Sequence, residues 1–187
     1  MIRILGISGS LRRDSYNGRL LANAAELLPA GAALELWAGL RDVPPYDQDD
    51  DVDPALPAVA HLRQAIADAD ALLLATPEYN GSIPGQLKNA IDWASRPVGR
   101  NVLRNKPAAV IGASMGRFGA VWAQGELRKV LWMAGARVVE NEFVAGRADR
   151  LFAVDGGLAD EEVRTQLAEV LAALVREARA QHKRLAA

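Results

Sequence analysis

The chain has 187 residues, of which 50% are hydrophobic and 24% charged, and its formal net charge of −1 gives no broad attraction to nucleic acid or to an anionic membrane surface. This length fits one hydrophobic core, so we expect a single domain over residues 1–187, and no apolar run approaches the about 20 residues that span a bilayer. With no cysteine and two histidines, His61 and His182, the chain has little material for disulfides, thiolate nucleophiles, metal sites or histidine-based triads, and a cytoplasmic location is expected.

Short apolar runs alternate with helical stripes along the chain. The patterns predict strands over 2–7, 33–37, 70–76, 107–113 and 136–140. They predict helices over 16–28, around 59–69, around 87–94, over about 118–133 and over about 160–182. On the third helix, Lys88 and Asp92 are spaced to face each other on the outer side.

Five strands that alternate with five helices are typical of an α/β fold with a doubly wound, mostly parallel sheet covered on both faces. The strand order 2-1-3-4-5 is one of the two common arrangements. It places a ligand beyond the carboxyl ends of strands one and three. Functional residues are therefore expected in the two loops that leave those strands.

The first of these loops, residues 8–16, is rich in groups that bind anions. Ser10, Arg12, Ser15 and Asn17 form the pattern Ser-x-Arg-x-x-Ser-x-Asn between a strand and a helix. Hydroxyls, an amide, a guanidinium and the free N–H groups of a helix N-terminus together suit a phosphate. Asp14 does not suit such a site, so we expect it to point to solvent, together with Arg13. The plainer interpretation is that Ser15 only caps the helix.

Phosphate-binding motifs of other kinds are missing. The sequence contains no G-x-x-x-x-G-K-[ST] motif, and the first strand–helix turn lacks G-x-G-x-x-G. A loop with hydroxyls but no lysine or magnesium carboxylate fits a phosphate monoester bound without metal. The second loop, TPEYNGSIPG over residues 76–85, has two prolines that fix its path and two glycines that let backbone approach a flat ligand.

Three motifs carry a resemblance to a known family. GSLRxxSxN after the first strand, PEYNGSIPGxLKNAIDW after the third, and the turn Ser114-Met115-Gly116 after the fourth resemble the NADPH-dependent FMN reductase family. The resemblance extends in order from residue 2 to the last helix. It implies a flavodoxin-like fold and an NAD(P)H-dependent oxidoreductase, in a family that includes quinone, chromate and azo-dye reductases.

The resemblance also implies roles for individual residues. The FMN phosphate is expected on Ser10, Arg12, Ser15 and Asn17, and the edge of the isoalloxazine ring on the backbone of Pro77, Glu78, Tyr79, Asn80 and Gly81. Ser114, Met115 and Gly116 are expected to close the third side. The flavin N5 takes the hydride from NADPH or NADH, so no catalytic side chain and no metal is required.

Several side chains keep two interpretations. Glu78 fits a general acid or, more readily, a salt bridge at an interface. Arg96 and Arg117 fit nucleotide-phosphate ligands that flank the site or exposed loop arginines. Trp93 and Trp122 fit core or interface packing better than contact with the flavin. The alternating aspartates of residues 47–53 lack the glycine and glutamate of a calcium-binding EF-hand and are interpreted as a solvated loop.

The predicted helix over 118–133 is apolar on two sides. One side carries Ala120, Ala123, Leu127, Val130 and Leu131, and the other carries Trp122, Gly125, Trp132 and Met133. Such a helix covers its own sheet and a second surface, which predicts a homodimer or a homotetramer with this helix at the contact. The resemblance implies the same. The alternative functions are a flavodoxin-like electron carrier and a flavin-binding sensor, neither of which oxidises NAD(P)H.

Overall fold

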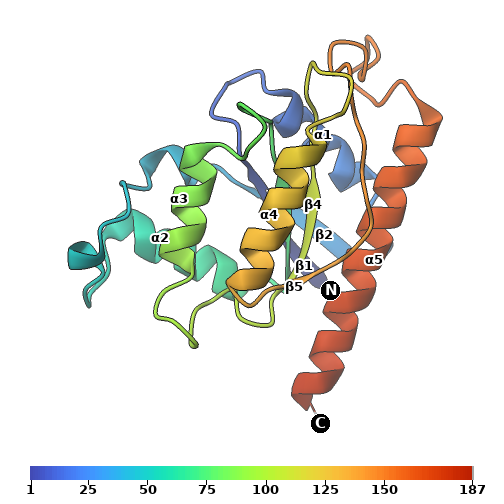
Figure 1. Cartoon of the computed structure of the whole chain (residues 1–187). Helices are drawn as coiled ribbons and strands as arrows, with labels where there is room; N and C mark the ends of the chain where they lie inside the picture. The colour runs from blue at the N-terminus through green and yellow to red at the C-terminus, as the bar shows by residue number, and fades with distance from the viewer. Residues whose placement is uncertain (187) are drawn as a thin grey trace.

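The computed structural model describes residues 1–186 and shows one parallel sheet between two layers of helices (Figure 1). Within these residues the sheet has five strands in the order β2-β1-β3-β4-β5, which confirms the predicted order. The strands are β1 (Ile2–Ser8), β2 (Ala32–Trp37), β3 (Ala71–Ala75), β4 (Pro107–Ile111) and β5 (Arg137–Val138). The helices are α1 (Tyr16–Glu26), α2 (Pro57–Asp68), α3 (Gly85–Ala94), α4 (Val121–Met133) and α5 (Glu161–Ala186), with short 3-10 turns η1 (Gly39–Asp42) and η2 (Gln48–Asp50).

The two central strands supply both halves of the core. Every residue of β3 and β4 is buried, which explains their continuous apolar runs. Leu72 and Leu74 of β3 point to the layer formed by α2, α3 and α4, whereas Leu73 points to the layer formed by α1 and α5. The alternation of side chains along a strand therefore divides one apolar run between two separate clusters.

The C-terminal half differs most from the prediction. Helix α4 begins at Val121 and not near Phe118, because Gly119 and Ala120 have φ of 58° and 60°, in the left-handed region. Strand β5 has two residues where five were expected. An irregular segment, residues 139–160, follows it and buries Phe143 and Leu151 in the core. Periodicity could not show this segment, because its apolar residues recur with neither a helical nor a strand spacing.

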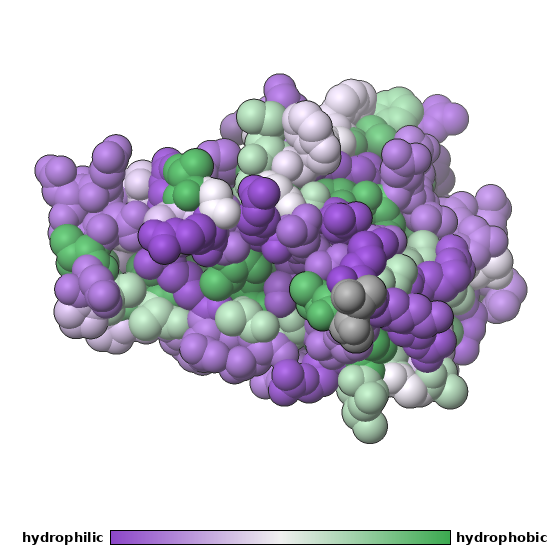
Figure 2. All heavy atoms as spheres, turned by 90° about the horizontal axis from the view of Figure 1, so that it is seen from below, coloured by the Kyte–Doolittle hydropathy of each residue, from purple (hydrophilic) through white to green (hydrophobic). Residues whose placement is uncertain are grey.

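The face of the molecule that is seen from below is mostly hydrophilic. Figure 2 views the molecule from below, and hydrophobic residues form separate patches there among hydrophilic ones.

The predicted ion pair on the outer side of α3 is present, with Lys88 Nζ 2.7 Å from Asp92 Oδ1. No helix within residues 1–186 is long and apolar enough to cross a membrane.

Candidate functional site

A cavity of about 370 Å³ lies at the carboxyl edge of the sheet, where the loops after β1, β3 and β4 meet. Its volume falls in the range of about 300–1,000 Å³ that is usual for small-molecule sites. All the predicted cofactor residues except Asn80 and Gly81 line it, and so do two residues that were not predicted, Tyr16 and Ala113. The full lining is Ser10, Arg12, Ser15, Tyr16, Asn17, Pro77, Glu78, Tyr79, Ala113, Ser114, Met115 and Gly116.

The first loop presents donors that are only weakly engaged within the protein. Ser15 is the N-cap of α1, and its hydroxyl accepts from the N–H groups of Asn17 and Gly18 at 3.2 and 3.3 Å. The hydroxyl of Ser10 accepts from the N–H of Arg12 at 3.4 Å. These distances exceed the usual N–H···O value of about 2.9–3.0 Å, so an anion with better geometry can compete for the same donors. The structure thus confirms that Ser15 caps α1, and it places the same residue in the lining of the cavity.

The charged neighbours on this loop lie as expected. Asp14 and Arg13 are exposed and do not line the cavity. The guanidinium of Arg41, on η1, donates to the carbonyl of Leu11 at 2.8 Å and holds the loop from outside. Sequence reasoning missed Arg41, because nothing in its own segment indicates a partner in the first loop.

Asn17 lines the cavity and also has a structural role that was not predicted. Its side chain is 2% exposed, its Nδ2 donates to the carbonyl of Ala113 at 3.0 Å, and its Oδ1 accepts from the N–H of Ala113 at 2.9 Å. The amide is therefore occupied with the backbone that follows β4, and one Nδ2 hydrogen is left for a ligand. Asn17 ties the first loop to the third.

The second loop folds into a tight hairpin. Tyr79 and Ser82 exchange two backbone hydrogen bonds at 3.0 and 3.1 Å, and Asn80 and Gly81 between them have φ of 54° and 75°. Two central residues with positive φ are what a type I′ turn requires, and Asn-Gly is the preferred pair. The turn carries Asn80 and Gly81 outward, which is why these two residues are exposed and do not line the cavity.

The first two loops approach each other closely. A Cβ atom on Gly9 would lie 2.8 Å from Leu87 and 3.3 Å from Pro77, so only glycine fits between the first loop and α3 without a shift. Gly112, at the end of β4, is similarly confined, because a Cβ there would lie 2.6 Å from the carbonyl oxygen of Thr76. These glycines allow three strand ends to converge on one small volume.

Glu78 caps a helix within its own chain. Its Oε2 accepts from the backbone N–H groups of Trp122 and Ala123, each at 3.1 Å, in the first turn of α4. This arrangement corresponds to neither earlier interpretation, because the carboxylate is engaged by backbone donors and not by a substrate or an arginine. The sequence contains no signal for it, since the partners are more than 40 positions away.

The third loop is held by the irregular segment. The carbonyl of Ser114 accepts from the N–H of Ala148 at 3.0 Å, and the carbonyl of Gly116 accepts from the N–H of Arg147 at 3.1 Å. Ala113 and Ala145 form a parallel bridge beside them. Residues 139–160 therefore replace a longer fifth strand as the support for this side of the cavity.

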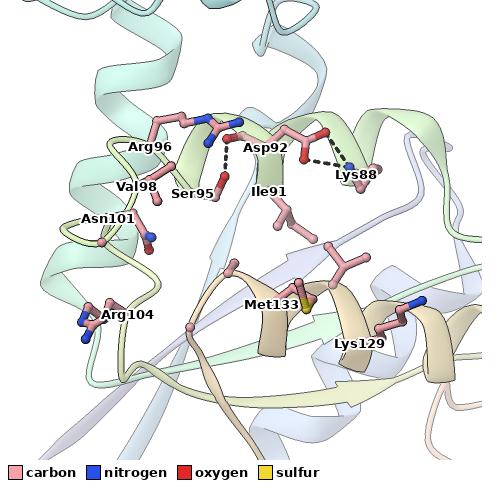
Figure 3. Close-up of a pocket in the computed structure, with 14 residues that line it drawn as sticks. Lys88, Ile91, Asp92, Ser95, Arg96, Val98, Asn101, Arg104, Lys129 and Met133 are labelled. Carbon is pink, nitrogen blue, oxygen red and sulfur yellow. Dashed lines mark hydrogen bonds and ion pairs between the residues drawn. The ribbon is translucent and has the colours of Figure 1, made fainter.

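The structure corrects the predicted place of Arg96. Helix α3 runs back from the carboxyl edge of the sheet, so Arg96 after its end lies at the amino edge (Figure 3). There it donates to the hydroxyl of Tyr46 at 3.0 Å and lines a separate groove of about 510 Å³ between α3 and α4. Within the described chain, Arg96 does not flank the candidate site. Arg117 is exposed directly after Gly116, beside the cavity but not among its lining residues.

Trp93 and Trp122 lie in different surroundings. Trp93 is 1% exposed in the core and donates to the carbonyl of Pro44 at 2.9 Å, which confirms core packing. Trp122 is exposed on α4 and packs edge-on against Phe118.

The chemistry of the lining fits FMN. Hydroxyls and a guanidinium line the cavity where the first loop meets it, and the apolar side chains of Pro77, Tyr79 and Met115 line it where the second and third loops meet it. A phosphate monoester joined to a planar ring matches these two parts of the lining. Among residues 1–186 no group of histidine, cysteine, aspartate or glutamate side chains is arranged to hold a metal ion.

Comparisons with known proteins agree with this fit. The family model described as NADPH-dependent FMN reductase matches residues 2–150. An NAD(P)H-dependent FMN reductase of Pseudomonas aeruginosa is 45% identical over 174 residues, which cover 92% of this chain and 93% of that protein. A 2-hydroxy-1,4-benzoquinone reductase of a Burkholderia species is 48% identical over 130 residues, 69% of each chain.

Among solved structures, the flavoenzyme FerB of Paracoccus denitrificans, an NAD(P)H:acceptor oxidoreductase, superposes with a TM-score of 0.85 at 36% identity. That superposition covers 96% of this chain and 98% of FerB. The fold, the cavity and these matches identify an oxidoreductase with FMN as cofactor and NAD(P)H as reductant, and the chain belongs to the NADPH-dependent FMN reductase family.

Proposed function

We propose that the protein passes electrons in pairs from NAD(P)H through bound FMN to a quinone-type acceptor, in a ping-pong sequence. The observation that carries this proposal is the cavity at the carboxyl edge of the sheet, where anion donors of the first loop and apolar side chains of the second and third loops meet. This edge is where α/β sheets of this strand order bind their ligands.

The phosphate end is built for a dianion without a metal. Ser10, Ser15 and the guanidinium of Arg12 line it, and the N-terminus of α1 adds the N–H groups that the Ser15 hydroxyl holds at 3.2 and 3.3 Å, together with the positive end of the helix dipole. The charged donor is the strongest single contact on offer, because hydrogen bonds to charged groups contribute about 1.5–3 kcal/mol each. In this proposal the first loop anchors the cofactor and takes no part in electron transfer.

The ring end supports the proposed chemistry. When bound there, FMN supplies hydride acceptance from NAD(P)H and electron donation to the acceptor. The protein orients the ring between the Pro77–Tyr79 backbone and the Ser114–Gly116 turn. Tyr79 and Met115 flank this end and are 50% and 59% exposed, so the mouth is open to solvent. One open mouth favours alternate use by reductant and acceptor, which is the basis for proposing a ping-pong order.

The relatives favour quinones as the acceptor class. Proteins of Escherichia coli and Pseudomonas putida that are 37% and 36% identical to this chain are named quinone reductases. Azo compounds, chromate, nitro compounds and free flavin also need only an open flavin face, and they form the comparison set in an acceptor screen.

An electron carrier or a flavin sensor is the competing function. A carrier needs a strongly charged face for its protein partners, whereas this chain has a formal net charge of −1. We therefore favour an enzyme. The cytoplasmic location expected from the sequence stays a prediction.

We propose further that α4 joins two copies of the chain in a homodimer, which can pair again into a homotetramer. Its outer side exposes Trp122, Trp132 and Met133, at 56%, 67% and 70%. Large apolar side chains gathered on one helix face mark an interaction surface.

An anaerobic titration of the FMN-loaded protein with NADPH and with NADH tests the function. We expect the flavin absorbance to bleach at one equivalent, and the colour to return when a benzoquinone is added. A flavoprotein that stays oxidised under excess nucleotide supports the carrier or the sensor. A protein that retains no FMN refutes the interpretation of the cavity.

A further inference from the structure

Two carboxylates fasten the second loop to helix α4 in opposite directions. Glu78 of the loop accepts from the N–H groups of Trp122 and Ala123 at 3.1 Å each. Glu126 of the helix accepts from the Ser82 hydroxyl at 2.6 Å and from the Ile83 N–H at 3.3 Å. The loop is thus attached at both ends of its hairpin.

Helix α4 depends on this contact for its cap. Its own N-cap residue, Ala120, makes no side-chain hydrogen bond and has φ of 60°, a left-handed conformation that is unfavourable for alanine. The first N–H groups of any helix lack partners within the helix, and a negative charge near them is stabilised by the helix dipole. The Glu78 carboxylate supplies both the acceptor and the charge.

Glu78 also lines the cavity, between Pro77 and Tyr79. A side chain fixed at the start of a helix holds its own backbone in place, and here that backbone forms one wall of the proposed ring site. Helix α4 itself is held by buried Ala123, Leu127 and Leu131 against the sheet. The contact between Glu78 and α4 therefore holds the second loop, at the surface, against a helix that is packed on the core.

We propose that Glu78 is a positioning residue for the flavin reaction: by capping α4 it fixes the Pro77–Tyr79 wall, and its charge opposes build-up of negative charge on the ring. This inference rests on the proposed function. It assigns no proton transfer to Glu78, because both of the donors it faces are backbone amides that must stay bonded.

Glu78→Gln and Glu78→Ala separate the two parts of the proposal. Glutamine keeps an oxygen that can accept from the α4 amides but removes the charge. We expect FMN affinity within about threefold of the wild type, retained turnover, and a reduction equilibrium shifted about tenfold toward reduced flavin, which for a two-electron couple is about 30 mV. Alanine removes the acceptor as well, and we expect it to weaken FMN binding at least about tenfold and to slow turnover.

The measurements use FMN-loaded protein throughout. They are release of FMN on serial dilution, followed by the recovery of flavin fluorescence, reduction potential by equilibration with a reference dye, and steady-state turnover with NADPH and a benzoquinone. Glu169→Gln, at an exposed position on α5, is the matched control and should leave all three unchanged.

The outcomes distinguish the alternatives. If both Glu78 variants match the wild type in FMN affinity and in potential, Glu78 only caps a helix and the proposal is wrong. If Glu78→Gln binds FMN but loses turnover, the residue transfers a proton and the proposal is also wrong. Should Glu78→Ala not fold, the potential of Glu78→Gln still decides. A wild-type protein that binds no FMN overturns the proposed function itself, which none of the variant results does.

Discussion

Replacing Asn17 by alanine should cost more stability than any other single change at the cavity. The Asn17 side chain makes two hydrogen bonds to the backbone of Ala113, at 3.0 and 2.9 Å, and both residues are 2% exposed. The substitution therefore leaves one buried N–H and one buried carbonyl of Ala113 without partners.

The expected magnitude follows from these two groups. An unsatisfied buried polar group costs about 1–3 kcal/mol, and the higher helix propensity of alanine offsets about 0.5 kcal/mol. Two such groups together cost about 2–6 kcal/mol, so we expect the free energy of unfolding to fall by about 1.5–5.5 kcal/mol, a large share of the about 5–15 kcal/mol that is usual for a domain.

Urea denaturation monitored by tryptophan fluorescence measures this loss. The comparison should be made on FMN-free protein, because a bound ligand adds stability by mass action. Glu26→Ala, an exposed substitution on the same helix, should change the unfolding free energy by less than about 0.5 kcal/mol. A loss below about 1 kcal/mol for Asn17→Ala would refute the reasoning, since water would then replace the amide at no net cost.

Three further predictions concern the phosphate end of the cavity, the dependence of stability on acidic pH, and the oligomeric state. Arg12→Ala should raise the FMN dissociation constant about 10- to 100-fold in a fluorescence titration, while Arg13→Ala should not; equal effects would place the phosphate elsewhere. Burial raises the pKa of Asp70, but the hydrogen bond from the N–H of Arg3 and the pairing with His182 outweigh it and leave that pKa below its usual value. The stability that this lowered pKa contributes is present above the pKa of the unfolded state and is lost as pH falls through the folded-state pKa. Asp70→Asn should therefore flatten the loss of unfolding free energy between about pH 5 and pH 2. An unchanged slope of unfolding free energy against pH would contradict this. Trp132→Glu should shift sedimentation at micromolar concentration to a smaller species; a wild-type monomer would rule out the predicted homodimer.

Residue type and chain order were enough to predict the architecture and two of the loops that line the cavity, whereas the third loop was expected only from the family resemblance. The carboxyl ends of parallel strands meet at one edge, so Ser10, Pro77 and Ser114, each just after a strand, had to lie near one another. The chemistry of Ser10 as a phosphate ligand could then be interpreted from the sequence.

Partners far apart in sequence could not be predicted in this way. Asn17 is of a type that suits a phosphate ligand, and only the structure shows Ala113 beside it, 96 positions away. Arg96 follows the second motif closely in sequence, but α3 has 10 residues and carries it about 15 Å back along the sheet. Proximity in sequence to a motif is a poor guide once a helix intervenes.

Polar side chains cross-link the loops around the cavity, and these cross-links affect how tightly a ligand can bind. Asn17 ties the first loop to the third, Glu78 ties the second loop to α4, and Glu126 ties α4 back to the second loop. Every one of these contacts joins protein to protein, so the loops need no ligand to hold their positions. Binding that requires little ordering of loops loses less free energy to conformational entropy.

Ser10, Ser15 and Arg12 of the first loop differ from these cross-linked residues. The hydrogen bonds that they make within the protein are long, so they are the groups that can adapt to the phosphate. The structure therefore divides the site into a rigid wall for the ring and a first loop that adjusts, which explains why we expect Arg12→Ala to change affinity and Asn17→Ala to change stability.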